Sequence, residues 1–179
     1  ILRRSPAYLW ARELITDAKA GAPMAVVFRD DQFIPIQGHY GSTWRSDVAK
    51  AGAGTLLEHS IHDVDMLHFL IGSITDTSMR SHNFHGYPGI EDSVSATLQF
   101  ANGAVGTLSS IWHDNLTRPS QRSVEIFCEN RTITMRGHEW FGPVEWHDSD
   151  GATGSLGADE IDCDVAEAEI TNAVAVGAG

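Results

Sequence analysis

The sequence has 179 residues, enough for one ordinary domain with its own core. Hydrophobic residues make up 42% and charged residues 20%, as in globular rather than disordered proteins. The formal charge is −12, from 24 acidic and 12 basic residues, so phosphate backbones and anionic lipids are repelled. No apolar run approaches the roughly 20 residues that cross a bilayer. We therefore expect neither nucleic acid nor a membrane as a partner.

The start of the sequence and the cysteines indicate the cellular compartment more than the fold. Ile1 is not a start methionine, and the LRRSP that follows it lacks the apolar core and the cleavage site of a signal peptide. We therefore expect further sequence upstream. Cys128 and Cys163 lie far apart and form no C-x-x-C pair, which fits a reducing cytoplasm better than a disulfide scaffold. Cys128 is expected to be a small buried hydrophobe.

The first third of the chain predicts a helix, a strand and a long connection. Ser5 is a good N-cap, Pro6 suits the first helical position, and Gly21 lies where a C′ glycine belongs. The run PMAVVFRDDQF (23–33) is β-branched and aromatic and predicts a strand. The Gly-rich segment GHYGSTWRSDVAKAGAG (38–54) is long for a passive loop, so we expect it to carry function.

The stretch GAGTLLEHSIHDVDMLHFLIG (52–72) predicts one helix that Gly72 closes. Leu57, Ile61 and Val64 recur at helical spacing and are expected to form its apolar face. The same stretch is crowded with acidic and histidine side chains, and it contains no lysine or arginine. Solvated helix faces normally use lysine together with glutamate. The absence of lysine and arginine therefore suggests that these acidic and histidine side chains bind a ligand or transfer protons.

Three interpretations of these polar residues compete. They form a solvated face, or a metal site on His59, His62 and Asp65, whose three-residue spacings allow ligands to converge. The third interpretation is an acid–base pair of Glu58 and His62, which an i, i+4 spacing places one turn apart on one helix surface. A histidine can accept a proton near neutral pH, and a neighbouring carboxylate can orient it. The metal reading lacks an H-E-x-x-H motif and a fourth ligand.

The second half of the chain predicts an antiparallel sheet. DSVSATLQF (92–100) alternates strictly between apolar and polar residues, as in a strand that is buried on one face. Asn102-Gly103 predicts a type I′ hairpin turn. Further strand-like runs are AVGTLSSIW, RSVEIFCE and RTITMRG, at 104–112, 122–129 and 131–137. Helices followed by an antiparallel meander predict an α+β fold with one large sheet.

The tail and the missing motifs set further limits. Residues 149–179 are weakly patterned, and only DVAEAEITNAVAV (164–176) hints at a helix. We therefore treat residues 1–179 as a single α+β domain. No G-x-G-x-x-G follows a strand, and neither a Walker motif nor a G-x-S-x-G elbow is present, so the chain is not expected to bind a dinucleotide by itself. Gly52 and Gly54 are expected to form a flexible start to the helix.

Four quoted segments together resemble the Gfo/Idh/MocA oxidoreductases. They are RRSPAYLWARELI, WRSD, AGAGTLLEHSIHDVDMLHFLIG and GIEDSVSATLQFANGAVGTLSSIW, and the likeness covers most of residues 3–147. The resemblance implies a C-terminal α+β domain with a large open, mainly antiparallel sheet and helices on one face, like the C-terminal domain of glyceraldehyde-3-phosphate dehydrogenase. It implies NAD or NADP as cofactor, held mainly by a Rossmann domain that this chain lacks. It also implies a sugar, inositol or other polyol substrate.

The resemblance assigns roles to particular residues. His62 matches the catalytic histidine, which accepts the hydroxyl proton during hydride transfer. Glu58 stands where the family usually has Asp, and His59-Ser60 replaces a common Leu-Gly pair, so the pocket is expected to differ from that of typical members. No metal is expected, and the cofactor-binding residues are unknown because they belong to the missing domain.

The substrate pocket is implied to include four further residues. Trp44 and Arg45 match the loop that borders it, Asp65 matches a recurrent acid one turn after His62, and His113 follows the return strand within reach. The family also implies a homodimer or homotetramer formed through the open sheet. Alone, the chain is expected to be inactive. Two alternatives stay open: a stand-alone, non-catalytic binding or dimerisation module, and a metal-dependent hydrolase built on His59, His62 and Asp65.

Overall fold

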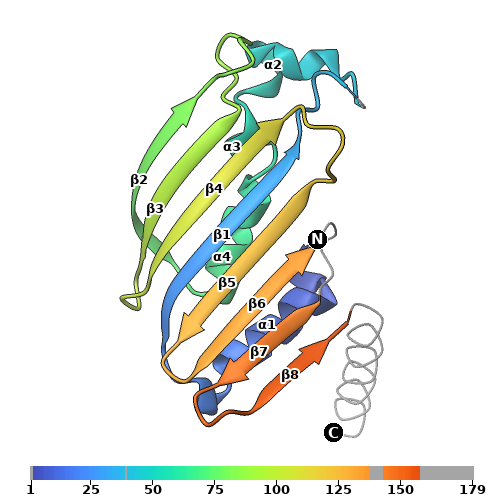
Figure 1. Ribbon diagram of the computed structural model, residues 1–179. Helices are drawn as coiled ribbons and strands as arrows, with labels where there is room; N and C mark the ends of the chain where they lie inside the picture. Colours follow the sequence, from blue (N-terminus) through green and yellow to red (C-terminus); the bar gives the residue numbers. More distant parts are fainter. Residues whose placement is uncertain (1, 39, 138–142, 158–179) are drawn as a thin grey trace, which may run out of the picture.

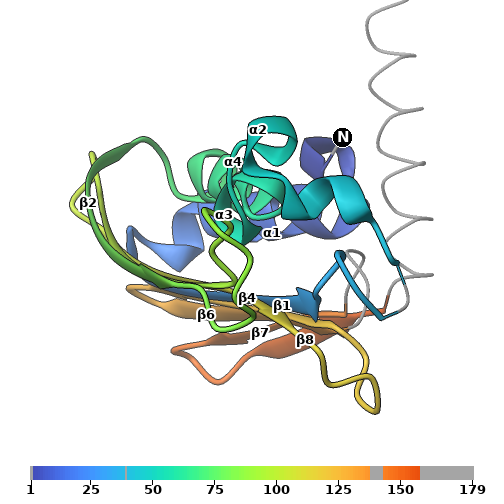
Figure 2. The same cartoon turned by 90° about the horizontal axis from the view of Figure 1, so that it is seen from above.

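Eight strands form one open sheet, and the helices cover a single face of it (Figures 1 and 2). The computed structural model describes residues 2–38, 40–137 and 143–157. The strand order is β2-β3-β4-β1-β5-β6-β7-β8. The strands are β1 (Pro23–Phe33), β2 (Ile74–His82), β3 (Ser93–Phe100), β4 (Val105–His113), β5 (Gln121–Cys128), β6 (Arg131–Gly137), β7 (Val144–Asp148) and β8 (Thr153–Leu156).

The helical segments fall into two groups. At the N-terminus and behind β6 and β7 lie η1 (Leu2–Arg4), α1 (Pro6–Thr16) and η2 (Ala18–Ala20). Between β1 and β2 come η3 (Thr43–Ser46), α2 (Val48–Ala51), α3 (Thr55–Glu58) and α4 (Ile61–Leu70). Among helices in the described part of the chain, none has the length and apolar character needed to cross a bilayer.

The sheet is antiparallel except where β1 enters it. β1 pairs in parallel with β4 and antiparallel with β5, so the strand that comes first in the chain lies at the centre. All other neighbouring strands pair antiparallel. The predicted α+β fold with a mainly antiparallel sheet is therefore confirmed, but it is not a simple meander.

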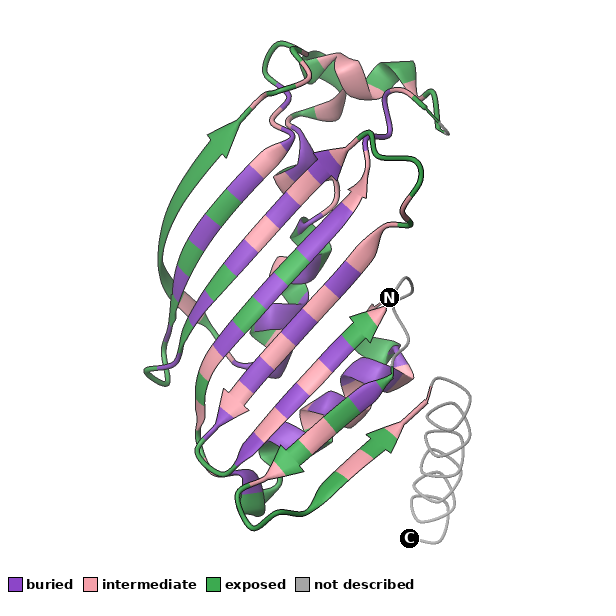
Figure 3. Cartoon of the chain, viewed as in Figure 1, coloured by how far each residue is buried: buried purple, intermediate pink, exposed green. Residues whose placement is uncertain are grey.

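The core lies between the helices and one face of the sheet. Along β3, Val94, Ala96, Leu98 and Phe100 are buried while the intervening polar residues face away, as the alternation predicted (Figure 3). α1 and α4 bury their apolar stripes against this face, and such a buried side chain contributes about 1.5–3 kcal/mol. Cys128 is buried, as expected, whereas Cys163 lies outside the described residues.

Four details differ from the sequence predictions. α1 ends at Thr16 rather than continuing to Gly21, and the Ser5 side chain does not cap it. Residues 52–72 form two helices, α3 and α4, instead of one. The β3–β4 turn is not type I′, because Gly103 has a positive φ of 91° and Asn102 does not.

The fourth difference is β8, a four-residue edge strand inside the segment that we took as weakly patterned. Its sequence, TGSL, is too short and too polar to signal a strand. Gly154 permits it, because a Cβ there would lie 2.1 Å from the Trp146 ring on β7. The helix predicted for residues 164–176 lies outside the described residues.

Candidate functional site

The connection between β1 and α3 brings three predicted site residues together. Arg45 in η3 donates from Nε to Glu58 Oε1 at 2.6 Å, and its guanidinium carbon lies 4.6 Å from the centre of the Trp44 ring. Arg45 Nη1 also donates to Ser42 Oγ at 2.9 Å. Arg45 and Glu58 are 28% and 18% exposed, so the pair is shielded but reachable. A carboxylate, a cation and an aromatic face thus border one place on the surface.

The start of α3 is fixed by close packing and is not flexible. A Cβ on Gly54 would lie 1.8 Å from the Glu91 carbonyl oxygen, so only glycine fits. Glu91 accepts hydrogen bonds from the Gly54 and Leu56 backbone N–H groups, at 2.7 and 3.1 Å. The expectation of a flexible glycine pair is wrong at Gly54. These contacts tie the helix that carries Glu58 to the β2–β3 connection.

The chain breaks its helix between Glu58 and His62. α3 ends at Glu58, and α4 begins at Ile61, so the two residues do not share one continuous helix surface as the i, i+4 spacing suggested. Ser60 at the break is fully buried, and its Oγ donates to Ser110 Oγ on β4 at 2.6 Å. Ser110 Oγ is also 2.7 Å from Thr55 Oγ1. This chain of hydroxyl groups holds the break against the sheet.

The break reverses which side chains are buried. Leu57 and Ile61, predicted to be apolar anchors, are 51% and 47% exposed, because the break rotates them out of the core. Asp63 takes a buried place instead, with no exposed surface. His62 in the first turn of α4 is exposed, and Glu58 is half-buried. The two residues predicted to be catalytic are thus both accessible.

Asp65 and His113 lie apart from this cluster. Asp65 forms an exposed ion pair with Arg3, with 2.5 Å between Oδ1 and Nη2, and this bond lowers the Asp65 pKa. The neighbouring strand positions Ser110 and Trp112 face the helices, so His113 points to the opposite face of the sheet. There its Nε2 lies 3.3 Å from Asp31 Oδ1. The sequence could not show this, since it placed His113 only by its position along the chain.

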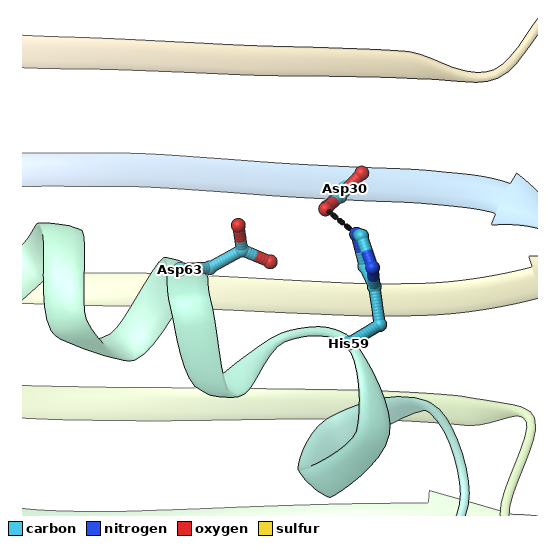
Figure 4. Close-up of side chains that lie close together, drawn as sticks. All are labelled: Asp30, His59 and Asp63. Atoms are coloured by element: carbon cyan, nitrogen blue, oxygen red, sulfur yellow. Dashed lines mark hydrogen bonds and ion pairs between the residues drawn. The ribbon is translucent and has the colours of Figure 1, made fainter. Parts of the chain in front are cut away.

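A buried cluster under the break contains two residues that the sequence analysis missed. Asp30 on β1 and Arg122 on β5 join His59 and Asp63 there. Figure 4 shows Asp30, His59 and Asp63. His59 Nε2 lies 2.6 Å from Asp30 Oδ2, and Arg122 Nη2 lies 3.2 Å from Asp63 Oδ1. A signal did exist: Asp30 occupies the helix-facing side of β1, in step with the buried Val26 and Phe28.

The cluster shifts the acidities of its two carboxyl groups in opposite directions. Burial works to raise the Asp30 pKa, but the His59 hydrogen bond and the Arg122 charge bring it below its ordinary value. Burial and then the Asp30 charge raise the Asp63 pKa well above its ordinary value. The surroundings thus favour the ionised form of Asp30 and the protonated form of Asp63.

A metal is the alternative occupant of this cluster. Among the described residues, ligand atoms of Asp30, His59 and Asp63 lie within 4.8 Å of one another. The Arg122 guanidinium, however, contacts both carboxyl groups and already supplies the positive charge there. The different set that the sequence suggested, His59, His62 and Asp65, does not converge, because His59 points to Asp30 and Asp65 to Arg3.

Comparisons with known proteins agree on the family. The family model described as the GFO/IDH/MocA C-terminal domain matches residues 8–134. A 1,5-anhydro-D-fructose reductase of Ensifer adhaerens is 28% identical over 120 residues, which are 65% of this chain and 33% of the reductase. The chain therefore belongs to the Gfo/Idh/MocA family, as its C-terminal domain, and the resemblance seen in the sequence is confirmed.

Solved structures share the fold. A levoglucosan dehydrogenase in complex with NADH and L-sorbose gives a TM-score of 0.76 at 20% identity, covering 87% of this chain and 44% of the dehydrogenase. An inositol dehydrogenase homolog complexed with NAD+ from Azotobacter vinelandii gives 0.74 at 15% identity, with 87% and 41% covered. The chain thus spans about a third of the matched reductase and less than half of these dehydrogenases.

Proposed function

We propose that this chain forms the substrate-binding half of an NAD(P)-dependent oxidoreductase that acts on a sugar, an inositol or a similar polyol. Its family membership and the names of its relatives support this class: a reductase of anhydrofructose, and dehydrogenases with NADH or NAD+ bound. The chain lacks a glycine-rich nucleotide fingerprint, so a separate nucleotide-binding domain would hold most of the cofactor.

The observation that carries the proposal is the Arg45–Glu58 pair beside the break that presents His62. NAD+ or NADP+, when bound, supplies the hydride acceptor. His62 takes the hydroxyl proton of the substrate at a ring nitrogen, a transfer that suits an imidazole near neutral pH. Glu58 and Arg45 neutralise each other at 2.6 Å, so they offer hydrogen bonds without a net charge. Such a surface suits an uncharged, hydroxyl-rich ligand.

The open face of the sheet supports the proposed homodimer or homotetramer. The described helices all lie on the other face (Figure 2), and Val27 and Val105 on the central strands are 44% and 54% exposed. Uncovered apolar residues at the middle of a sheet are typical of an interface. Light scattering should show an oligomer that Val27→Glu dissociates; an unchanged mass would contradict this interface. A cytoplasmic location stays a prediction from the cysteine usage.

The test compares two histidines of α4 in the complete enzyme. His62→Ala should lower kcat by about 10²–10⁴-fold, the usual contribution of a general base. His68→Ala, an exposed histidine near the end of the same helix, is the matched control and should keep kcat within about twofold. NADH affinity, measured by fluorescence titration, should change in neither variant. Equal losses of turnover and NADH affinity in His62→Ala would make His62 structural instead.

A further inference from the structure

Four ionisable side chains are packed into the contact between the α3–α4 break and the sheet. His59 and Asp63 come from the helical side and Asp30 comes from β1 (Figure 4). Arg122 comes from β5. The side chains of Asp30, Asp63 and Arg122 are at most 9% exposed, and that of His59 is 12% exposed. Burying this many charges costs free energy unless they balance.

The contacts show how the charges balance. Asp30 Oδ2 is bound by both His59 Nε2, at 2.6 Å, and Arg122 Nη2. Asp63 Oδ1 lies 3.2 Å from Arg122 Nη2. Two carboxylates face one permanent cation, so neutrality requires one more proton. The geometry favours Asp63 as its holder, because Asp30 Oδ2 is bound by both His59 and Arg122, whereas the Arg122 contact with Asp63 is longer.

His59 is the other described group of the cluster that can hold this proton, and the amide substitutions below distinguish Asp63 from His59. Tyr8 on α1 packs against the same region, and burial, the largest effect, raises its pKa, so it stays neutral. His59 donates to Asp30 when its Nε2 carries the ring proton. The raised pKa of Asp63, caused by its burial and by the Asp30 charge, agrees with this distribution. With that proton on Asp63, the charges of Asp30 and Arg122 balance.

The sequence places this cluster directly beneath the proposed site. His59 follows Glu58, and Asp63 follows His62, so each anchoring residue is the chain neighbour of a proposed active-site residue. Glu58 and His62 are accessible, whereas the side chains of His59 and Asp63 point to the sheet. Movement of either anchor therefore moves its neighbour. A displacement of about 1 Å in a catalytic group can cost about 10²-fold in rate.

We propose that Asp30, His59, Asp63 and Arg122 form a positioning cluster that holds the α3–α4 break and thereby sets the placement of Glu58 relative to His62. This inference rests on the proposed function. In the cluster Asp30 acts as a charge, and Asp63 acts as a neutral acid. The two aspartates are equally buried and share Arg122, but they are not interchangeable.

The test replaces each carboxylate by its isosteric amide in the complete enzyme. Asp63→Asn keeps an uncharged group of the same shape, so kcat should stay within about twofold. Asp30→Asn removes the charge that both His59 Nε2 and Arg122 Nη2 contact, so kcat should fall about 10–100-fold, with KM changed much less. Equal effects of the two substitutions, whether both harmful or both neutral, would overturn the proposal.

A second readout does not depend on activity. The amides of His62 and Val64 donate across the break to the carbonyl groups of His59 and Ser60. Their hydrogen exchange should accelerate in Asp30→Asn and not in Asp63→Asn. Uniform exchange in both variants would overturn the cluster's role in holding the break. Failure of the proposed function would look different, because His62→Ala would then leave turnover unchanged whatever happens to exchange.

Two controls keep the test decisive. If Asp30→Asn does not fold, the double variant Asp30→Asn/Arg122→Met, which removes both charges, should recover folding and amide protection. A double variant no more stable than Asp30→Asn would contradict the charge balance. Metal analysis of the purified enzyme tests the alternative, a metal site on Asp30, His59 and Asp63. We expect no stoichiometric metal. Stoichiometric metal that is lost in both aspartate variants would show a metal site instead of a positioning cluster.

Discussion

Two buried arginines of this domain, Arg131 and Arg122, lie in opposite electrostatic surroundings. Arg131 on β6 donates to Asp148 from Nε at 2.5 Å and from Nη2 at 3.0 Å, and Nη1 donates to the Leu14 carbonyl and to Asp17. Its donors are thus matched by acceptors, and the contacts tie α1 to β6 and β7. Arg122 instead contacts two carboxyl groups, those of Asp30 and Asp63, and shares Asp30 with His59.

The two sets of contacts suggest different roles for the two arginines. A fully paired arginine at a helix–sheet junction stabilises the fold and needs no further explanation. An arginine with one carboxyl group too many forces a proton into the interior, which a purely structural site would avoid. The second arrangement lies beneath the residues that we propose to be catalytic. We therefore expect substitution of Arg131 to change stability, and we propose that Arg122 supports the site.

The largest expected effect on stability is at Arg131. Arg131→Met removes the cation that binds Asp148 and the end of α1, so the free energy of unfolding should fall by about 3–5 kcal/mol. Arg136→Met, which breaks the exposed pair with Glu125, is the matched control and should cost less than about 1 kcal/mol. Urea titration of both variants checks this. Similar decreases in the free energy of unfolding of the two variants would contradict a larger contribution from the buried arginine.

The two clusters should respond to pH in opposite directions. The Arg131 hydrogen bond holds the Asp148 pKa well below its ordinary value, so its stabilisation is complete above about pH 4 and is lost as pH falls further. The Asp63 pKa is raised by burial, so its contribution is complete below about pH 4 and is lost as pH rises. Urea midpoints between pH 3 and 9 measure both limbs.

Each substitution should flatten one limb of that pH profile. Asp148→Asn should remove much of the acid-side loss, and Asp63→Asn should remove the loss on the alkaline side. Each variant serves as the control for the other. An alkaline limb that Asp63→Asn leaves unchanged would mean that Asp63 is ionised in the folded protein, which would contradict the charge distribution proposed for the cluster.

The smallest effect concerns Asp65, which the sequence predicted to bind substrate. Its exposed pair with Arg3 should contribute little to the free energy of unfolding, because solvent screens the two charges. If that pair is its role, Asp65→Asn and Arg3→Gln should behave alike, with KM for the substrate unchanged in both. A rise in KM for Asp65→Asn alone would support the original prediction and would place Asp65 in the pocket.

Much of the fold was readable from local patterns. Strict alternation identified β3, and the family motif identified the domain. The centre of the sheet was less readable, because the parallel pairing of β1 with β4 depends on contacts far apart in the chain. The break after Glu58 was hidden because Leu57 and Ile61 continue a helical pattern, while the Ser60–Ser110 hydrogen bond that fixes the break is a tertiary contact.

The candidate site divides in the same way. The motif identified Glu58 and His62, and the loop motif identified Arg45, whose contact with Glu58 agrees with a shared location. Asp30 and Arg122 were missed, because their role appears only when β1 and β5 are paired and α4 is packed on them. His113 was placed by its position along the chain alone, and strand alternation at the end of β4 turns it to the far face of the sheet.

The most direct test of the central claim is a crystal structure of the complete enzyme with cofactor and a polyol bound. The measurement is the distance from the nearest His62 ring nitrogen to the hydroxyl oxygen on the carbon that loses hydride. Our account predicts about 2.6–3.2 Å, the reach of a general base, with Glu58 and Arg45 bordering the same ligand. A His62 ring turned away from the substrate, with another group on that hydroxyl, would contradict it.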